Sequence, residues 1–274
     1  MKKYWFIGWT LALWLTLAPV SHACSIFSIK LGDKVLVGNN EDFWYDRDAR
    51  LWFAPAAKNN RGRVLFGWDN FAQGGMNDAG LFFDAASGPR PPAAQPGKSQ
   101  KIKTNIGDEL LARCATVEEA VALMQTYRLP TDYTGHLLFA DKSGASAVVE
   151  WNGAEYKVIR KIGDYQIITN FLLTQPELGD FPCPRYNRLQ ERLTGKQEIT
   201  GSEVATMLAS VAQFSEAKGR KSGTLYSTVH DLVSGEFVLF YQRNWQKPVR
   251  FKLAEELRKG KHSIRMAQLF GKHI

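Results

Sequence analysis

Alternating apolar and polar positions dominate the chain after residue 24, and a period of two is typical of β-strands. The stretches "CSIFSIK" (24–30) and "KVLVGNN" (34–40) flank a turn at Gly32-Asp33 and predict an N-terminal hairpin. Turn residues at 142–144 and 152–153 separate later strands and indicate an antiparallel meander. The further predicted strands are 80–86, 136–141, 145–151, 155–162, 165–170, 224–232 and 236–242.

Two helices are predicted from capping residues that precede apolar positions at helical spacing. Thr116 with Glu119 opens the first helix, and Thr200 with Glu203 opens the second. Strands and helices occur in blocks and do not alternate as β-α-β units. This order predicts an α+β fold with mainly antiparallel sheets. The stretch 88–97, rich in Pro and Ala, is predicted to be a loop, and nothing in it requires a domain boundary.

The first 23 residues have the pattern of an export signal. Lys2 and Lys3 precede an apolar run over 4–17, Pro19 interrupts it, and a small residue, Ala23, ends the segment. The apolar run is shorter than the roughly 20 residues that a membrane-spanning helix needs. We therefore expect residues 1–23 to be a signal peptide removed by signal peptidase. Residues 24–274 would then form a single exported domain, periplasmic or secreted.

Composition narrows the function classes that remain. The formal net charge is +8, to which the predicted signal contributes two lysines. The basic residues clustered over 243–265 suit a solvated helix face or an anionic envelope surface, so no nucleic-acid partner is expected. The five histidines lack metal-ligand spacing, and no phosphate-binding glycine loop occurs, so neither a metal nor a cofactor is expected. Cys114 and Cys183 would be free to pair in an oxidising compartment, although their separation in space is open.

Cys24 follows the expected cleavage point directly, and three interpretations of it compete. Cleavage after Ala23 would give this residue a free α-amino group, whose reference pKa of about 7.7 to 8.0 lets it accept the thiol proton. Cys24 would then be a nucleophile that carries its own base. The alternatives are a lipid-modified cysteine, for which Ser21 and His22 fit the usual preceding residues poorly, and an inert thiol.

Several short motifs are arranged in the order found in one enzyme family. They are Cys24, "GNNED" (38–42), "GMNDAGL" (75–81), "ITN" (168–170) and "CPRYN" (183–187). With these motifs the chain resembles the choloylglycine hydrolase family of N-terminal nucleophile hydrolases, which contains bile salt hydrolases and penicillin V acylases. The motifs extend over most of the expected mature chain.

The resemblance implies a four-layer αββα sandwich and hydrolysis of a linear, non-peptide amide. It implies that Cys24 is the nucleophile, that Asp42 holds the α-amine, and that Asn170 helps to bind the oxyanion. Arg185 would support the thiol or the substrate. These roles form a coherent set, because acyl transfer needs an activated thiolate and fixed donors near the developing oxyanion.

Three further residues are implied as substrate-binding. Asn39 stands where the family has an arginine next to the nucleophile, so a cation that would depress the thiol pKa is missing. Ser87 falls near the position of a second family asparagine, and a hydroxyl reaches less far than an amide. Phe83 belongs to a set of aromatic residues that would line an acyl pocket. These differences predict slow turnover or a substrate unlike bile salts.

The sequence thus predicts an exported amidase or acylase that acts on a small-molecule acyl amide through a Cys24 thioester. The competing class is a non-enzymatic envelope protein, lipidated on Cys24 or binding a partner. An acyltransferase that uses the same thioester is a further alternative. The acyl group and the leaving amine are open at this point, and so is assembly into a homo-oligomer.

Overall fold

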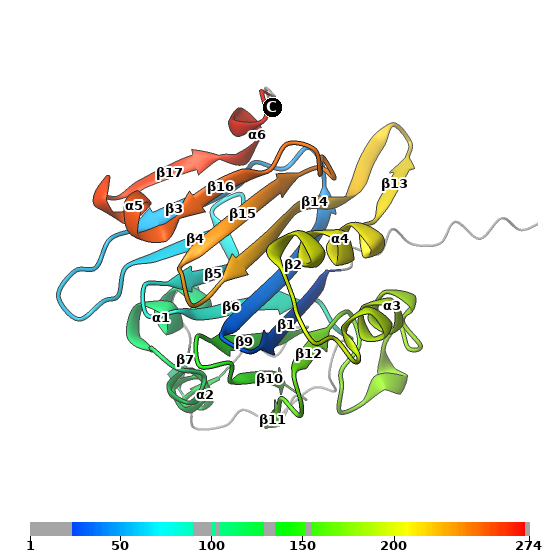
Figure 1. Ribbon diagram of the computed structural model, residues 1–274, viewed down its shortest axis with the longest axis horizontal. Coiled ribbons are helices and arrows are strands. Elements are labelled where there is room, and N and C mark those ends of the chain that lie inside the picture. Colours follow the sequence, from blue (N-terminus) through cyan, green and yellow to red (C-terminus); the bar gives the residue numbers. More distant parts are fainter. Residues whose placement is uncertain (1–23, 90–99, 102–104, 129–134, 152–154, 272–274) are drawn as a thin grey trace, which may run out of the picture.

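A computed structural model of the chain describes residues 24–89, 100–101, 105–128, 135–151 and 155–271. The predicted signal peptide, most of the predicted loop at 88–97 and the turn at 152–153 lie outside the described residues. The described chain folds into two large β-sheets that lie face to face, with helices on their outer surfaces (Figure 1).

The first sheet has seven strands, and it contains the predicted N-terminal hairpin at its centre. Every pair in it is antiparallel. Its spatial order is β12 (Tyr165–Ile168), β1 (Ser25–Leu31), β2 (Lys34–Trp44), β14 (Arg220–Asp231), β15 (Glu236–Tyr241) and β16 (Val249–Lys252), and β13 (Phe214–Ala217) pairs with β14.

The second sheet has eight antiparallel strands and includes the predicted meander. A separate short parallel pair joins β7 (Gln100–Lys101) to β8 (Tyr127–Arg128). The spatial order of the large sheet is β11 (Tyr156–Arg160), β10 (Ser146–Trp151), β9 (His136–Asp141), β6 (Leu81–Ala86), β5 (Phe71–Asn77), β4 (Arg63–Trp68), β3 (Ala49–Ala54) and β17 (His262–Arg265).

Helices cover the outer face of each sheet. The helices α3 (Pro184–Leu193) and α4 (Gly201–Val211) contact the first sheet, and Figure 1 shows α4 lying across β2 and β14. The helices α1 (Ile106–Arg113) and α2 (Val117–Gln125) contact the second. The remaining short helices are η1 (Pro176–Leu178), α5 (Leu253–Arg258) and α6 (Met266–Leu269). The α+β prediction of a four-layer αββα sandwich is confirmed.

The capping residues act as predicted. The side chain of Thr116 accepts a hydrogen bond from the Glu119 amide, and Thr200 with Glu203 forms a complete capping box.

Because helices and a second sheet cover both faces of β2, its residues from Val35 to Asp42 are buried without alternation. Three apolar clusters fill the layers, one between the sheets and one beneath each helix pair. Within the described residues, no helix is long and apolar enough to cross a membrane.

The layer between the sheets encloses an unusual histidine. The His230 ring stacks with Phe66 and Phe237, with ring centroids 5.3 Å apart in both pairs. Neither ring nitrogen has a hydrogen-bond partner among the described residues. Burial lowers the pKa of His230 to about 3, because the charged imidazolium is poorly solvated there.

We expect His230→Phe to make the protein more resistant to acid. The unfolded chain takes up a proton near pH 6.5, whereas the folded chain resists it down to about pH 3, so stability falls as pH falls through this window. The gain in unfolding free energy of the variant over the natural protein should therefore rise by about 2 kcal/mol between pH 7 and 4.5. Urea unfolding at both pH values measures this gain. An equal difference at the two pH values would contradict the prediction.

Candidate active site

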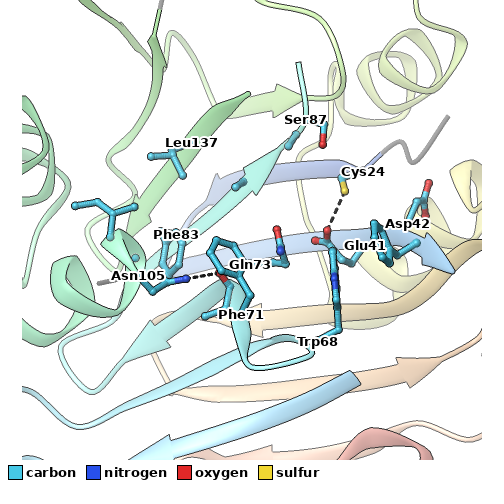
Figure 2. A pocket seen from close by; sticks show the side chains of 16 residues that line it. Cys24, Glu41, Asp42, Trp68, Phe71, Gln73, Phe83, Ser87, Asn105 and Leu137 are labelled. Carbon is cyan, nitrogen blue, oxygen red and sulfur yellow. Dashed lines mark hydrogen bonds between the residues drawn. The ribbon is translucent and has the colours of Figure 1, made fainter. Parts of the chain in front are cut away.

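Cys24 lies immediately before β1, at the edge of the layer between the two sheets. Only 4% of the residue is exposed, and its thiol reaches the wall of a cavity of about 260 Å³ (Figure 2). Strand β1 pairs with β2 on one side and with β12 on the other, so the backbone after Cys24 is held from both sides. The fold thus presents a single buried thiol to a cavity.

The thiol makes one side-chain hydrogen bond, to a carboxyl group that faces it from β2. Its Sγ lies 3.0 Å from Oε1 of Glu41 (Figure 2). Ser25 pairs with Asn40, so Glu41 is the next β2 residue and stands opposite Cys24. Glu41 is only 1% exposed, and its second oxygen, Oε2, has no hydrogen-bond partner among the described residues.

The carboxyl groups around the thiol hold it in its protonated form. Burial raises the pKa of the Cys24 thiol well above its ordinary value, and the nearby Glu41 and Asp42 raise it further. Burial also raises the pKa of Glu41 to about 8, with Asp42 contributing. A thiolate at this position would therefore need a nearby cation to stabilise it.

Asp42 carries a second buried carboxyl group close to the Cys24 thiol. Neither of its side-chain oxygens has a hydrogen-bond partner within the described part of the chain, and the residue is 1% exposed. Burial raises the pKa of Asp42 to about 7, against the opposing influence of the Thr224 side chain and of the guanidinium groups of Arg185 and Arg243. A buried carboxylate without a partner is costly, so this position suits a bound cation.

Arg185, from the first turn of α3, donates hydrogen bonds to several residues around the site. Its Nη1 donates to the carbonyl oxygen of Cys24 at 2.6 Å and to the hydroxyl of Ser25 at 2.8 Å. Its Nη2 donates to Oδ1 of Asn170 at 2.9 Å. The Asn170 amide nitrogen in turn donates to the carbonyl oxygen of Ser87 at 2.8 Å. Arg185 therefore fixes the orientation of the Asn170 amide, with its donor near Ser87.

The cavity beside Cys24 is mainly apolar. Aromatic side chains form much of its wall, and Phe43 stacks on Trp68 with ring centroids 4.3 Å apart. Phe83 lines the cavity from β6, and Ser87 lines it on the side of Cys24 (Figure 2). The cavity thus suits an apolar group placed next to the thiol. Its other lining residues are Glu41, Asp42, Phe71, Ala72, Gln73, Ala85, Ala86, Asn105, Ile106, Gly107 and Leu137.

A family model described as acyl-coenzyme A:6-aminopenicillanic acid acyl-transferase matches residues 72–244. The chain belongs to this acyl-transferase family. The match includes Phe83, Ser87, Asn170 and Arg185, whereas Cys24 and the residues on β2 precede it. No curated protein matches the sequence significantly.

Solved structures of N-terminal nucleophile hydrolases share the fold of this acyl-transferase family member. A variant of conjugated bile acid hydrolase from Clostridium perfringens aligns with a TM-score of 0.66 at 16% identity, over 88% of this chain and 95% of that chain. Penicillin V acylase from Agrobacterium tumefaciens aligns with a TM-score of 0.63 at 20% identity, over 83% and 85%. The N-acylethanolamine-hydrolyzing acid amidase orthologue from Caenorhabditis elegans gives 0.52 at 14% identity, over 77% and 93%. The resemblance predicted from the motifs is confirmed.

Three predicted site residues of this acyl-transferase family member, Asn39, Asn170 and Arg185, are not among the residues that line the cavity. Asn39 is completely buried on β2, two residues before Glu41. Glu41, by contrast, has no predicted role from the motif, although it contacts the thiol. The β-strand period could have found it, because the β1–β2 hairpin places Glu41 opposite Cys24.

The two other cysteines take no part in the site. Cys114 follows α1, Cys183 precedes α3, and both thiols are free, so the pairing left open by the sequence is not made. No group of His, Cys, Asp and Glu side chains with the geometry of a metal site occurs among the described residues.

Proposed function

We propose that this protein is an amidase or acylase that hydrolyses a linear amide C–N bond through a thioester on Cys24. The observation that carries the proposal is the placement of the buried Cys24 thiol at the wall of an apolar cavity, beside the unpartnered carboxyl group of Asp42. Membership of an acyl-transferase family supports acyl chemistry at this site. The apolar wall formed by Phe43, Trp68 and Phe83 favours an apolar acyl group.

The activating group is the α-amine that Cys24 gains when the bond after Ala23 is cut. In its charged form this amine supplies the cation that the buried Asp42 lacks. In its neutral form it accepts the thiol proton, and the resulting ammonium stabilises the thiolate. Export and cleavage by signal peptidase, into the periplasm or the medium, belong to the same proposal.

The reaction then follows from the position of the donors. The thiolate attacks the amide carbon, and the negative charge that develops on its oxygen needs fixed donors nearby. The amide group of Asn170, oriented by Arg185, is the proposed side-chain donor. The ammonium returns its proton to the leaving amine, which leaves the acyl group on Sγ as a thioester for water to hydrolyse.

An acyltransferase is the second candidate, because the family description names a transferase and a thioester passes its acyl group to an amine as well as to water. A lipid anchor on Cys24 is disfavoured. The thiol is buried beside Glu41, whereas a lipid anchor on Sγ would have to reach the protein surface. The mass of the mature N-terminus distinguishes a free Cys24 from a lipidated one.

The substrate class is tested with a set of acyl amides that share one chromogenic amine. We expect apolar acyl groups that fit a cavity of about 260 Å³ to be cleaved best. Adding a second amine to the same reactions separates the hydrolase from the acyltransferase, because only the latter forms a new amide. Failure of all amides and esters to acylate Cys24 would contradict the proposal.

Asn170 provides a prediction that separates a catalytic from a structural role. Asn170→Asp retains the oxygen that accepts from Arg185 but loses the amide donor, whereas Asn170→Ala loses both. If the donor binds the oxyanion, both variants should lower kcat by around 100-fold, the usual scale for such a donor. Steady-state kinetics and thermal unfolding measure the two effects. A normal kcat in Asn170→Asp would assign the residue to the structure.

A further inference from the structure

Glu41 is the closest titratable partner of the nucleophile, and the proposed mechanism leaves it without a task. Its Oε1 lies 3.0 Å from Sγ, it lines the cavity, and its Oε2 is unpartnered among the described residues. A fully buried carboxyl group with an open oxygen directed at a substrate cavity needs an explanation. In Figure 2 its carboxyl group points toward the Cys24 sulfur, and a dashed line joins the two.

Formation of a thioester changes the surroundings of Glu41 directly. The acylated sulfur carries no proton, so Oε1 loses the hydrogen bond that it accepts from the thiol. Both oxygens of the carboxyl group are then open, next to the thioester carbon. A buried carboxylate in this state attracts any proton donor that enters, and the nucleophile of the second half-reaction is such a donor.

We propose that Glu41 is a further catalytic residue, the general base that activates water in hydrolysis of the Cys24 thioester. This inference rests on the proposed thioester function. The α-amine would serve the first half-reaction and Glu41 the second. The two carboxyl groups of "GNNED" would thus have separate tasks, Asp42 holding the amine and Glu41 deprotonating the incoming water.

The proton and electron pairs balance around one cycle. Glu41 takes a proton from water while the water oxygen forms its bond to the thioester carbon. The tetrahedral intermediate then breaks its C–S bond, and the electron pair leaves with sulfur. The protonated Glu41 returns its proton to Sγ across the 3.0 Å contact. The free acid departs, and the thiol–carboxyl hydrogen bond seen in the structure is restored.

The surroundings suit a base that works near neutral pH. The pKa of Glu41 is about 8, and loss of the thiol hydrogen bond, which lowers it, makes the acylated form more basic still. Tyr226 on β14 is paired with Glu41 in the same sheet, whereas Asp84 lies on β6 of the opposite sheet. Burial, followed by the charge of Glu41, raises the pKa of each well above its ordinary value. Burial thus favours the protonated form of both groups. Asp42 also raises the pKa of Glu41, whereas the side chain of Asn39 lowers it.

The test uses p-nitrophenyl butyrate and the mature protein with a free Cys24. Acylation releases p-nitrophenol in a burst, whereas later release follows deacylation. Because p-nitrophenol leaves without protonation, the burst depends little on a general acid. We expect Glu41→Gln to keep a burst of full size but to lose steady-state turnover by about 100-fold or more, the scale of general base catalysis. Butyryl-enzyme should accumulate by mass spectrometry, and the pH dependence of deacylation near pH 8 should disappear.

Asp84→Asn is the matched control, because an amide mimics the protonated acid in the same buried cluster without contacting sulfur. The deacylation rate of Asp84→Asn should stay within a few-fold of the rate of the unaltered protein. Glu41→Asp should retain part of the rate together with its pH dependence. Full turnover in Glu41→Gln, or an equal loss in Asp84→Asn, overturns the role of Glu41. If Glu41→Gln shows no burst while the unaltered protein does, the proposed role of Glu41 is also overturned. If the unaltered protein itself shows no burst, the thioester function is overturned.

Discussion

Cys24→Ala should abolish turnover while leaving the fold intact. The thiolate is the attacking species in the proposed reaction, and no other described cysteine lines the cavity. Cys24→Ser should retain at most a trace, because a serine hydroxyl is far harder to deprotonate than a thiol. Hydrolysis of the best substrate of the acyl-amide set measures both losses, and circular dichroism checks the fold.

Cys114→Ala is the matched control, since Cys114 is equally buried but lies outside the cavity. It should retain the rate of the unaltered protein. Iodoacetamide should inactivate the Cys114→Ala protein by alkylating Cys24, which peptide mass spectrometry can locate. An unchanged rate in Cys24→Ala would rule out the thioester mechanism.

The second large effect is expected from the bond between Ala23 and Cys24. As long as this bond is intact, the nitrogen of Cys24 is an amide and cannot accept the thiol proton. Cleavage converts it to an amine that titrates near pH 8 in the unperturbed case, and its charged form pairs with the buried Asp42. A chain that keeps residues 21–23 should therefore fold but show no turnover.

A protease site placed to release a bare Cys24 should restore activity in the same sample, which serves as its own control. Turnover and the intact mass can be followed together, so that activity is compared directly with the fraction cleaved. Equal rates for the extended and trimmed chains would show that the α-amine is not the base. Glu41, 3.0 Å from the sulfur, would then be the first group to test in that role.

The strands and helices that the sequence predicted are those with strong local signals. The hairpin, the meander and the two capped helices α2 and α4 occur where expected, because turn residues and caps act within a few residues. The strands β3, β4 and β5 were not predicted. In β4 and β5 the pattern is interrupted by Gly67, Gly74 and Gly75, where close packing leaves no space for a side chain.

The site residues that could be predicted from the sequence are those that lie within the family motifs. Arg185 donates to the carbonyl oxygen of Cys24 and to the side-chain oxygen of Asn170, and these contacts join residues far apart in the sequence. Two features required the structure. Asn39 lies away from the cavity, and Glu41 faces the thiol, because register and burial decide which side chains of β2 reach the sulfur.

The contact between Arg185 and the carbonyl oxygen of Cys24 has a consequence for the timing of assembly. It joins residues 161 positions apart, and β2 must also pair with β14, which begins at Arg220. Contacts of such long range form late in folding, since the intervening chain has to be ordered first. A chain still emerging from the ribosome therefore has no assembled centre, and Cys24, the first residue that the structure describes, is among the last to gain its native contacts.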